Sequence, residues 1–208
     1  MTSSSLPEAG NARQRQREET RARIVAAAVD VFAEKSFAGA STREIARRAG
    51  TNQGLITYHF QSKEALWRAA ATSIFDALGE QLAERLSSLE LSDPREKARE
   101  GIRQYVRFAA AHPEFFRIMV DEGRVADERM TWLVDHLLRP RFEEIRKALL
   151  GIVQIDEALV PHAFYALAGA ASLIFAVEPE CRRLTGVDPT GASTIERHAD
   201  YVARLMVP

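Results

Sequence analysis

Apolar residues recur at every third and fourth position through most of this 208-residue chain, and this spacing constrains its fold more than any other feature. In the stretch "TRARIVAAAVDVFAEK", Ile24, Ala27, Ala28, Val31 and Phe32 fall on one face of a helix, with charged residues off that face. The same period returns in later segments, and no segment alternates convincingly as a strand does. The sequence therefore predicts an all-α protein of about nine helices.

Capping residues set the predicted helix boundaries. Ser41 and Glu44 form a capping box, Ser62 precedes a long helix, and Asp93 followed by Pro94 begins another. The predicted helices cover residues 18–39, 41–50, 53–60, 63–86, 94–112, 114–122, 127–150, 156–178 and 194–206, with Pro140 as a kink in the seventh.

Charge and cysteine content limit the partners and the compartment. Residues 1–70 hold eleven Lys and Arg against seven Asp and Glu, whereas residues 71–208 hold seventeen against twenty-two, so basic charge gathers at the N-terminal end. The single cysteine, Cys181, fits a reducing compartment, and we expect a cytoplasmic protein. Residues 158–177 carry no charge, but they are rich in Ala and Gly and flanked by acids, which favours a helix buried on all sides over a membrane span.

Residues 41–60 are predicted to form two short helices separated by a glycine turn, which is the arrangement of a helix-turn-helix unit. In a helix-turn-helix unit, the second helix enters the major groove of DNA while the first crosses the backbone. Asn52 and Gln53 are suited to bidentate pairing with adenine, and Arg43 with guanine. The residues suited to phosphate contacts are Thr42, Tyr58, His59 and Lys63. An ordinary helical hairpin with a solvated polar face is the alternative at this stage.

The same region resembles a known family. "STREIARRAGTNQGLITYHFQSKEALW", preceded by "RARIVAAAVDVFAEKSFAGA", is similar to the N-terminal DNA-binding domain of TetR family (TetR/AcrR type) transcriptional regulators over residues 18–78. The agreement includes Thr-x-x-Ile-Ala, Gly50, Gly54, the Tyr-His-Phe triplet and Ser-Lys-Glu-x-Leu. The resemblance implies that Arg43 and residues 53–59 face DNA, with Lys63 on a phosphate. The expected DNA-binding residues are Thr42, Arg43, Thr51, Asn52, Gln53, Leu55, Thr57, Tyr58, His59 and Lys63.

Two positions depart from the family's usual pattern, and one segment extends beyond it. Family members usually carry a small polar residue at the position of Leu55 and often an aromatic at that of Thr57, so the resemblance leaves the operator sequence open. In the "RQRQR" run, Arg13, Arg15 and Arg17 are able to reach a minor groove or further phosphates. The favoured alternative is a solvated, disordered basic tail over residues 1–17.

Residues 79–208 resemble the family only in layout. That layout implies a ligand-binding and dimerisation domain, whose last two long helices pair with those of a second copy to form a homodimer. The expected interface residues are Ala168, Gly169, Ser172, Phe175, His198 and Val202. The expected lining of a pocket for an apolar or aromatic effector is Phe108, His112, Phe116, Met119, Trp132, His136, Phe164 and Tyr165, although plain core is the favoured interpretation of each aromatic.

The sequence shows no enzyme signature. Gly-x-Gly, Gly-x-Ser-x-Gly, His-Glu-x-x-His and Glu-x-x-His are all absent, so we expect no catalytic residue, no metal site and no cofactor. The expected function is that of a ligand-responsive, homodimeric transcriptional repressor bound to a near-palindromic DNA operator, without a membrane role. The alternative is a helical protein that binds a small molecule or a partner and whose helix-turn-helix no longer serves DNA.

Overall fold

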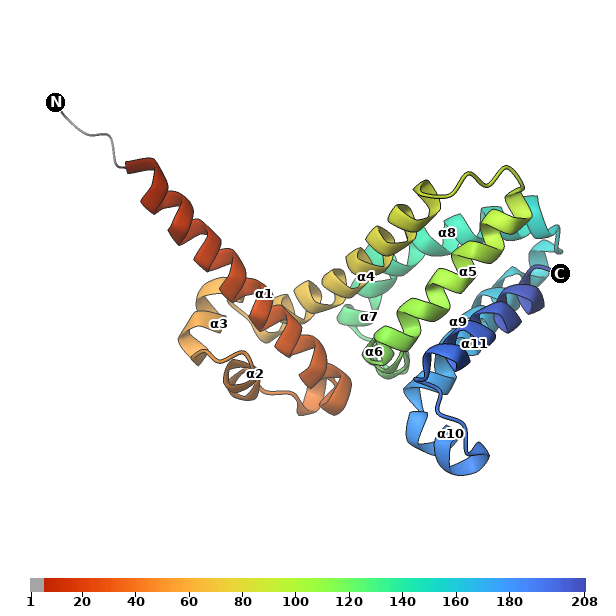
Figure 1. The fold of residues 1–208 in the computed structure, drawn as a ribbon. Helices are drawn as coiled ribbons and strands as arrows, with labels where there is room; N and C mark the ends of the chain where they lie inside the picture. The colour runs from red at the N-terminus through yellow and green to blue at the C-terminus, as the bar shows by residue number, and fades with distance from the viewer. Residues whose placement is uncertain (1–5) are drawn as a thin grey trace. The chain divides into compact units, whose positions relative to one another are not determined.

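The computed structural model describes the backbone of residues 6–208 and the side chains from residue 11 onward. Every regular element in this part of the chain is helical, which confirms the predicted all-α class. The chain divides into two compact units, Met1–Ser73 and Ile74–Pro208 (Figure 1). Each unit is described below by itself.

The first unit consists of α1 (Leu6–Gly39), α2 (Thr42–Arg48), α3 (Gln53–Phe60) and the first turns of α4 (Lys63–Ser87). The apolar face predicted for α1 is buried, as expected from its spacing. Side chains from the other helices complete this core, and Trp67 of α4 is its largest fully buried member. The core residues contributed by α2, α3 and α4 are Ile45, Ala46, Ile56, Phe60, Leu66, Trp67, Ala70 and Ala71.

The N-terminal part of α1 differs from the disordered tail predicted for residues 1–17. The helix begins at Leu6, and residues 1–5 of that tail lie outside the described residues. Residues 11–19 are exposed all around the helix, so packing does not hold this segment. Gln, Arg, Glu and Ala are good helix formers, and the side-chain amide of Gln14 donates to Glu18 at 2.6 Å, one turn later. The polar and charged composition that led to the prediction of disorder for this segment is equally typical of a solvent-exposed helix.

The second unit is built around a core shared by three helices that lie side by side, α5 (Pro94–Ala111), α9 (Val160–Ala176) and α11 (Ala192–Met206) (Figure 1). Apart from Phe175, its fully buried members are alanines and valines, which let the helices approach closely. They are Val106 and Ala109 of α5, Ala171 and Phe175 of α9, and Ala199 and Val202 of α11. Around them lie α6 (Pro113–Gly123), α7 (Glu128–Leu133), α8 (Arg139–Ala148) and α10 (Glu178–Thr185).

Two details of the second unit were not predicted. The loop expected after Pro179 contains the helix α10, in which this proline occupies the first turn, where it needs no amide hydrogen bond. The long helix expected over residues 127–150 is present, but π-helical turns at Val134–Leu138 (η1) and Leu149–Val153 (η2) interrupt it. Pro140 follows η1 directly, and its missing N–H removes one of the regular helical bonds at this point.

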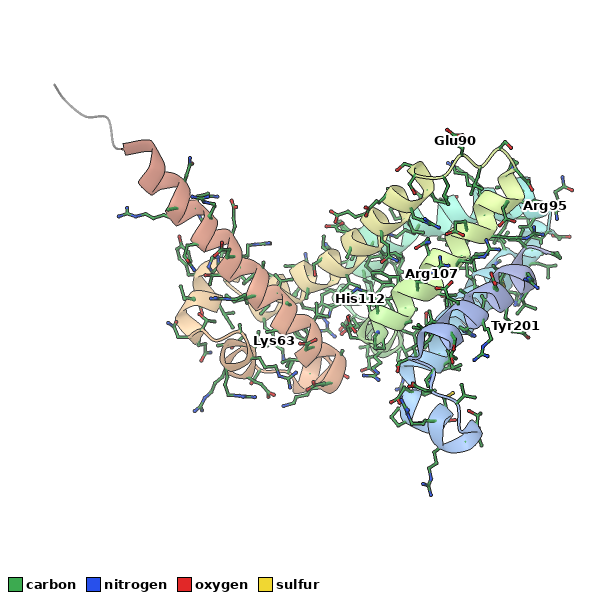
Figure 2. All side chains as sticks on the ribbon, viewed as in Figure 1. Lys63, Glu90, Arg95, Arg107, His112 and Tyr201 are labelled. Atoms are coloured by element: carbon green, nitrogen blue, oxygen red, sulfur yellow. The ribbon has the colours of Figure 1, made fainter. Side chains whose placement is uncertain are left out.

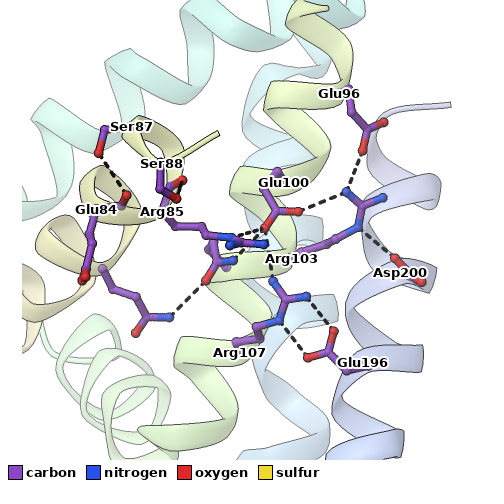
Figure 3. Close-up of polar contacts among 12 residues, drawn as sticks. Glu84, Arg85, Ser87, Ser88, Glu96, Glu100, Arg103, Arg107, Glu196 and Asp200 are labelled. Carbon is purple, nitrogen blue, oxygen red and sulfur yellow. Dashed lines mark hydrogen bonds and ion pairs between the residues drawn. The ribbon is translucent and has the colours of Figure 1, made fainter. Parts of the chain in front are cut away.

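A network of ion pairs joins α4, α5 and α11 around the buried carboxylate of Glu100 (Figure 3). Arg85 of α4 contacts it at 3.2 Å, and Arg103 and Arg107 of α5 contact it at 3.3 Å each. Arg103 and Arg107 also reach across to α11, where they pair with Asp200 at 2.8 Å and Glu196 at 2.6 Å. Burial raises the pKa of Glu100, but hydrogen bonds from Gln104, Arg85 and Arg103 outweigh that effect and hold the pKa below its ordinary value.

The apolar segment Glu157–Ala176 is less buried than the sequence predicted. Within the described residues it is the one helical stretch long and apolar enough to span a bilayer, which by itself is weak evidence for a membrane. Only 22% of its most apolar window is buried inside the subunit, whereas a helix buried on all sides was expected. Tyr165 is 75% exposed and Leu173 is 52% exposed, so an apolar face of α9 lies on the surface.

Candidate nucleic-acid interface

Two caps and one glycine shape the turn between α2 and α3. The backbone N–H of Glu44 donates to the Ser41 hydroxyl at 3.2 Å, which confirms the predicted start of α2. Gly50 then adopts a left-handed conformation with φ of 61°, which lets the chain turn immediately after the helix. Asn52 caps α3 by accepting from the N–H of Leu55 at 3.0 Å. Local hydrogen bonds and one glycine therefore set the direction of α3.

The inward side of α3 is apolar and its outward side is polar. Ile56 and Phe60 are buried at 2% and 5% exposure, and they hold the helix against the core. Gln53 and Thr57 are exposed on the other side, as is Arg43 near the start of α2. The Gln53 amide donates to the Thr42 hydroxyl at 3.0 Å, so α2 and α3 are joined on this exposed side. On α3, the exposed polar residues Gln53 and Thr57 are thus separated from the buried anchors Ile56 and Phe60.

Asn52 has a structural task that the sequence interpretation did not assign. Its Oδ1 atom accepts the capping hydrogen bond of α3, and a side chain at Gly54 would bring its Cβ to 3.1 Å from the same oxygen. A bidentate pair with adenine needs both the oxygen and the amide nitrogen of asparagine. The capping hydrogen bond therefore competes with the predicted adenine contact for the Oδ1 atom of Asn52. The amide nitrogen of Asn52 stays available to donate to DNA.

The predicted phosphate-contacting residues lie in different surroundings. Tyr58 is 61% exposed, whereas Lys63, at the start of α4, is half-buried with its Nζ 4.5 Å from the ring centroid of Phe37 (Figure 2). Burial, together with the charges of Arg17 and Arg21, lowers the pKa of His59 below its ordinary value. His59 is therefore neutral at pH 7 in the free protein, and Lys63 lies beside the core.

A groove between α1 and α3 adds residues that were absent from the predicted site. It has a volume of about 930 Å³ and is lined from α3 and its turn by Asn52, Leu55, Tyr58 and His59, among others. Its α1 wall consists of Arg13, Gln14, Gln16, Arg17, Thr20 and Arg23. The four-residue spacing of Arg13 and Arg17 is a sequence signal for a shared helix face, but it carries this meaning only once the segment is known to be helical.

Comparisons with known proteins agree with this geometry. The model described as "Bacterial regulatory proteins, tetR family" matches residues 24–70, which include α2, α3 and the turn between them. The HTH-type transcriptional repressor Rv3405c of Mycobacterium tuberculosis is 32% identical over 197 residues, covering 92% of this chain and 92% of that protein. This chain belongs to the tetR family of bacterial regulatory proteins. It is accordingly a DNA-binding transcriptional regulator, as the sequence predicted.

Two further comparisons place this tetR-family protein among its relatives. The HTH-type transcriptional repressor NicS of Pseudomonas putida is 34% identical over 111 residues, which make up 53% of this chain and 51% of NicS, so this alignment spans about half of each protein. FadR of Bacillus subtilis, solved in complex with stearoyl-CoA, superimposes with a TM-score of 0.62 at 19% identity and covers 89% of this chain and 96% of that one. At this identity the second match shows a shared fold.

The structure distributes the predicted effector-pocket residues of this tetR-family protein over separate ring clusters. Phe108 and His112 contact each other with ring centroids 4.5 Å apart, and Trp132 and His136 stack at 5.1 Å. Both pairs are four residues apart on one helix, so they are local contacts. Phe164 contacts Phe142 and the exposed Tyr165. Phe116 and Met119 are half-buried on α6.

The predicted dimer residues require a correction. Ser172, Phe175 and Val202 are at most 1% exposed and belong to the core of their own subunit, so they are not available to a partner. His198 is half-buried, and its Nε2 contacts the carbonyl of Ala170 at 2.8 Å, while Ala168 and Gly169 are half-buried on α9. Small and apolar residues occur on every face of α9, so the spacing of apolar residues in the sequence did not reveal which face of the helix is exposed. The exposed apolar residues of the two helices are instead Tyr165, Leu173, Tyr201 and Leu205.

Proposed function

We propose that this tetR-family regulator is a cytoplasmic homodimeric repressor that binds a near-palindromic operator and releases it when a small molecule binds among helices α5–α9. The observation that carries the DNA-binding part is the exposed polar side of α2 and α3. There Arg43 of α2 and Gln53 and Thr57 of α3 are exposed, and the turn between the two helices is capped internally by Asn52. A two-fold dimer presents two such helices to half-sites about 34–36 Å apart.

The proposed base-contacting residues are Arg43, Gln53, Leu55 and Thr57. Arg43 is suited to guanine, Gln53 to adenine, and Leu55, which is 36% exposed, to the methyl group of thymine. The exposed Thr57 donates its hydroxyl to the Gln53 carbonyl at 3.3 Å in the free protein. The proposed phosphate contacts are Thr42, Thr51, Tyr58, His59 and Lys63, with the Asn52 amide nitrogen beside them.

The exposed apolar face formed by Tyr165 and Leu173 of α9 with Tyr201 and Leu205 of α11 is the proposed dimer surface, replacing the residues expected from the sequence. This face lies on α9 and α11, whose opposite sides form the core of the second unit. The same two helices therefore provide both the core and the proposed dimer surface. Figure 2 shows Tyr201 pointing outward from α11. A self-complementary patch of this kind pairs with its own copy about a two-fold axis.

The proposed effector is an apolar or aromatic small molecule. The support is the set of aromatic side chains on α5, α6 and α9, with His112 and its partner Glu114, 2.9 Å away, as polar groups at one end of α5. An effector that binds the released conformation about 100-fold more tightly shifts operator affinity by about 2.7 kcal/mol. Titration of candidate molecules into the DNA complex, with the bound fraction followed by fluorescence anisotropy, tests this proposal.

Selection of bound duplexes from a random library, followed by gel-shift measurement of the selected duplex, tests operator binding. Arg43→Ala should weaken binding by about 1–3 kcal/mol and relax preference at one base pair, since arginine pairs with guanine through two hydrogen bonds. Lys63→Ala should weaken all duplexes about equally and flatten the salt dependence by about one unit of slope. Equal salt slopes and unchanged base preference in both variants would show that these roles are misassigned. No sequence-specific shift with the unmodified protein would favour the alternative, a helical binding protein without a DNA role.

Substitution of Asn52 separates its capping role from base contact. Asn52→Ser keeps a side-chain oxygen that accepts from the α3 backbone, whereas Asn52→Ala removes it and should lower the free energy of unfolding by about 1 kcal/mol. If capping is the whole role, Asn52→Ser keeps both the stability and the base preference of the unmodified protein. A Ser variant of full stability that has lost preference at one A·T pair would assign base contact to Asn52 as well. Urea unfolding and the selected duplex provide the two measurements.

A further inference from the structure

The groove between α1 and α3 contains concentrated positive charge. Arg13, Arg17 and Arg23 line its α1 wall, and no Asp or Glu lines it among the side chains that the structure describes. Glu18 lies on the same helix outside the groove and accepts from Gln14. The charge of the three arginines is therefore not balanced inside the groove, which makes it suited to an anion.

The arginines lie on a helix, α1. Arg13 and Arg17 lie one helical turn apart, about 6 Å along the axis of α1. This separation is close to the rise of two base pairs of duplex DNA, at about 3.4 Å each. Residues 11–19 contact nothing that buries them, so their side chains are available to a partner. A flexible tail would lack both the spacing and the fixed direction.

The two walls of the groove are connected. The guanidinium carbon of Arg17 lies 5.4 Å from the ring centroid of Tyr58, and the rings of Tyr58 and His59 meet edge to face at 5.1 Å. A cation at this distance from an aromatic ring is attracted to it. Arg17 therefore helps to position Tyr58, whose proposed role is a phosphate contact, and it faces the same occupant as Tyr58 does.

We propose that this arginine groove, lined by Arg13, Arg17 and Arg23 opposite Tyr58 and His59, holds the sugar-phosphate backbone at the edge of the major groove that α3 enters. The inference rests on the proposed operator binding and extends it beyond the helix-turn-helix residues. The groove supplies sequence-independent affinity, since phosphates are the same at every base pair. The arginine groove extends the stretch of DNA backbone contacted at each half-site, but it adds no recognition of bases.

Arg15 provides a matched control, because it lies between Arg13 and Arg17 in sequence, has the same charge and is exposed, yet does not line the groove. The probes are the selected operator duplex and an unrelated duplex of equal length, titrated between about 50 and 200 mM salt. Arg17→Gln should reduce the slope of log affinity against log salt by about 0.9 per contact, or about 1.8 for a dimer. Arg13→Gln/Arg17→Gln should double this change, and Arg15→Gln should leave the slope near that of the unmodified protein. Equal changes for Arg15→Gln and Arg17→Gln would instead indicate a diffuse basic tail and overturn the proposal.

Hydroxyl-radical footprinting gives a positional readout. The unmodified protein should protect backbone positions flanking each half-site, and Arg13→Gln/Arg17→Gln should lose that flanking protection while keeping protection at the centre. An unchanged footprint would overturn the proposal even if affinity fell. Failure of the unmodified protein to protect any site would count against operator binding itself, which is a separate outcome. Circular dichroism checks that the variants remain helical, as expected for an exposed Gln.

Discussion

Glu100→Gln should lower the free energy of unfolding by about 1.5–3 kcal/mol, because it removes the charge from the hydrogen bonds that the buried carboxylate accepts from Arg85, Arg103 and Gln104. The Glu100 side chain is only 9% exposed and is shared by Arg85, Arg103 and Arg107. Arg103 and Arg107 keep carboxylate partners on α11, whereas Glu100 is the carboxylate that Arg85 pairs with among the described residues, so the loss should fall most heavily on the connection between α4 and α5. Urea unfolding at pH 7, followed by circular dichroism, measures the effect.

The control for this substitution is Glu96→Gln, which removes a carboxylate from the same network at a more exposed position. The Glu96 side chain is 37% exposed and pairs with Arg103 at 2.8 Å, so its loss should cost less than about 1 kcal/mol. The pKa of Glu100 is lowered in the folded protein, so its contribution is complete above the unfolded value of about 4.3 and is lost as the pH falls through the folded value. Equal losses for the two variants would show that burial does not distinguish these carboxylates.

Leu173→Glu/Tyr201→Glu should convert the dimer into a monomer and weaken operator binding by at least about 100-fold, since linked half-site binding is then lost. Leu173 and Tyr201 are 52% and 65% exposed on the proposed dimer surface, and a two-fold dimer would have to bury both new carboxylates of each subunit in an apolar contact, which is unfavourable. Sedimentation equilibrium gives the molar mass, and the gel shift on the selected duplex gives the affinity.

Val125→Glu serves as the control for the dimer substitution, because Val125 is 46% exposed but follows α6, away from the residues of the proposed surface. It should leave both mass and operator affinity unchanged. A double variant that remains a dimer would place the subunit contact elsewhere on the chain. A stable monomer with unchanged operator affinity would instead contradict the need for two linked half-sites.

The accuracy of the sequence interpretation depended on how local each signal was. The caps at Ser41, Ser62 and Asp93 were predicted correctly, because capping needs only a side chain and the next few backbone amides. The capping box predicted for Ser41 and Glu44 was only half realised, since the Glu44 carboxylate pairs with Lys35 and Arg48 instead of the cap backbone. Distant partners determined that outcome, and spacing along the chain does not reveal them.

The errors have the same origin. In α9, Ala and Gly surround the helix, so its apolar pattern did not indicate which side faces the core, and Ser172 and Phe175 were assigned to the wrong one. Pro179 marks the end of one helix, but it suits the first turn of the next equally well, so α10 was missed. The role of Arg17 depended on α1 continuing as a helix, which charged composition alone did not predict.

The separation of tasks within α3 has a consequence for how this protein can diverge. Asn52, Ile56 and Phe60 cap and anchor the helix, whereas Gln53, Leu55 and Thr57 contribute little to burial. Substitutions at such exposed positions usually change stability by less than about 0.5 kcal/mol. With the base contacts proposed for Gln53, Leu55 and Thr57, new operator preferences would be accessible through single substitutions that leave folding almost unchanged. Duplicated copies of such a gene could acquire separate targets without first passing through an unstable protein.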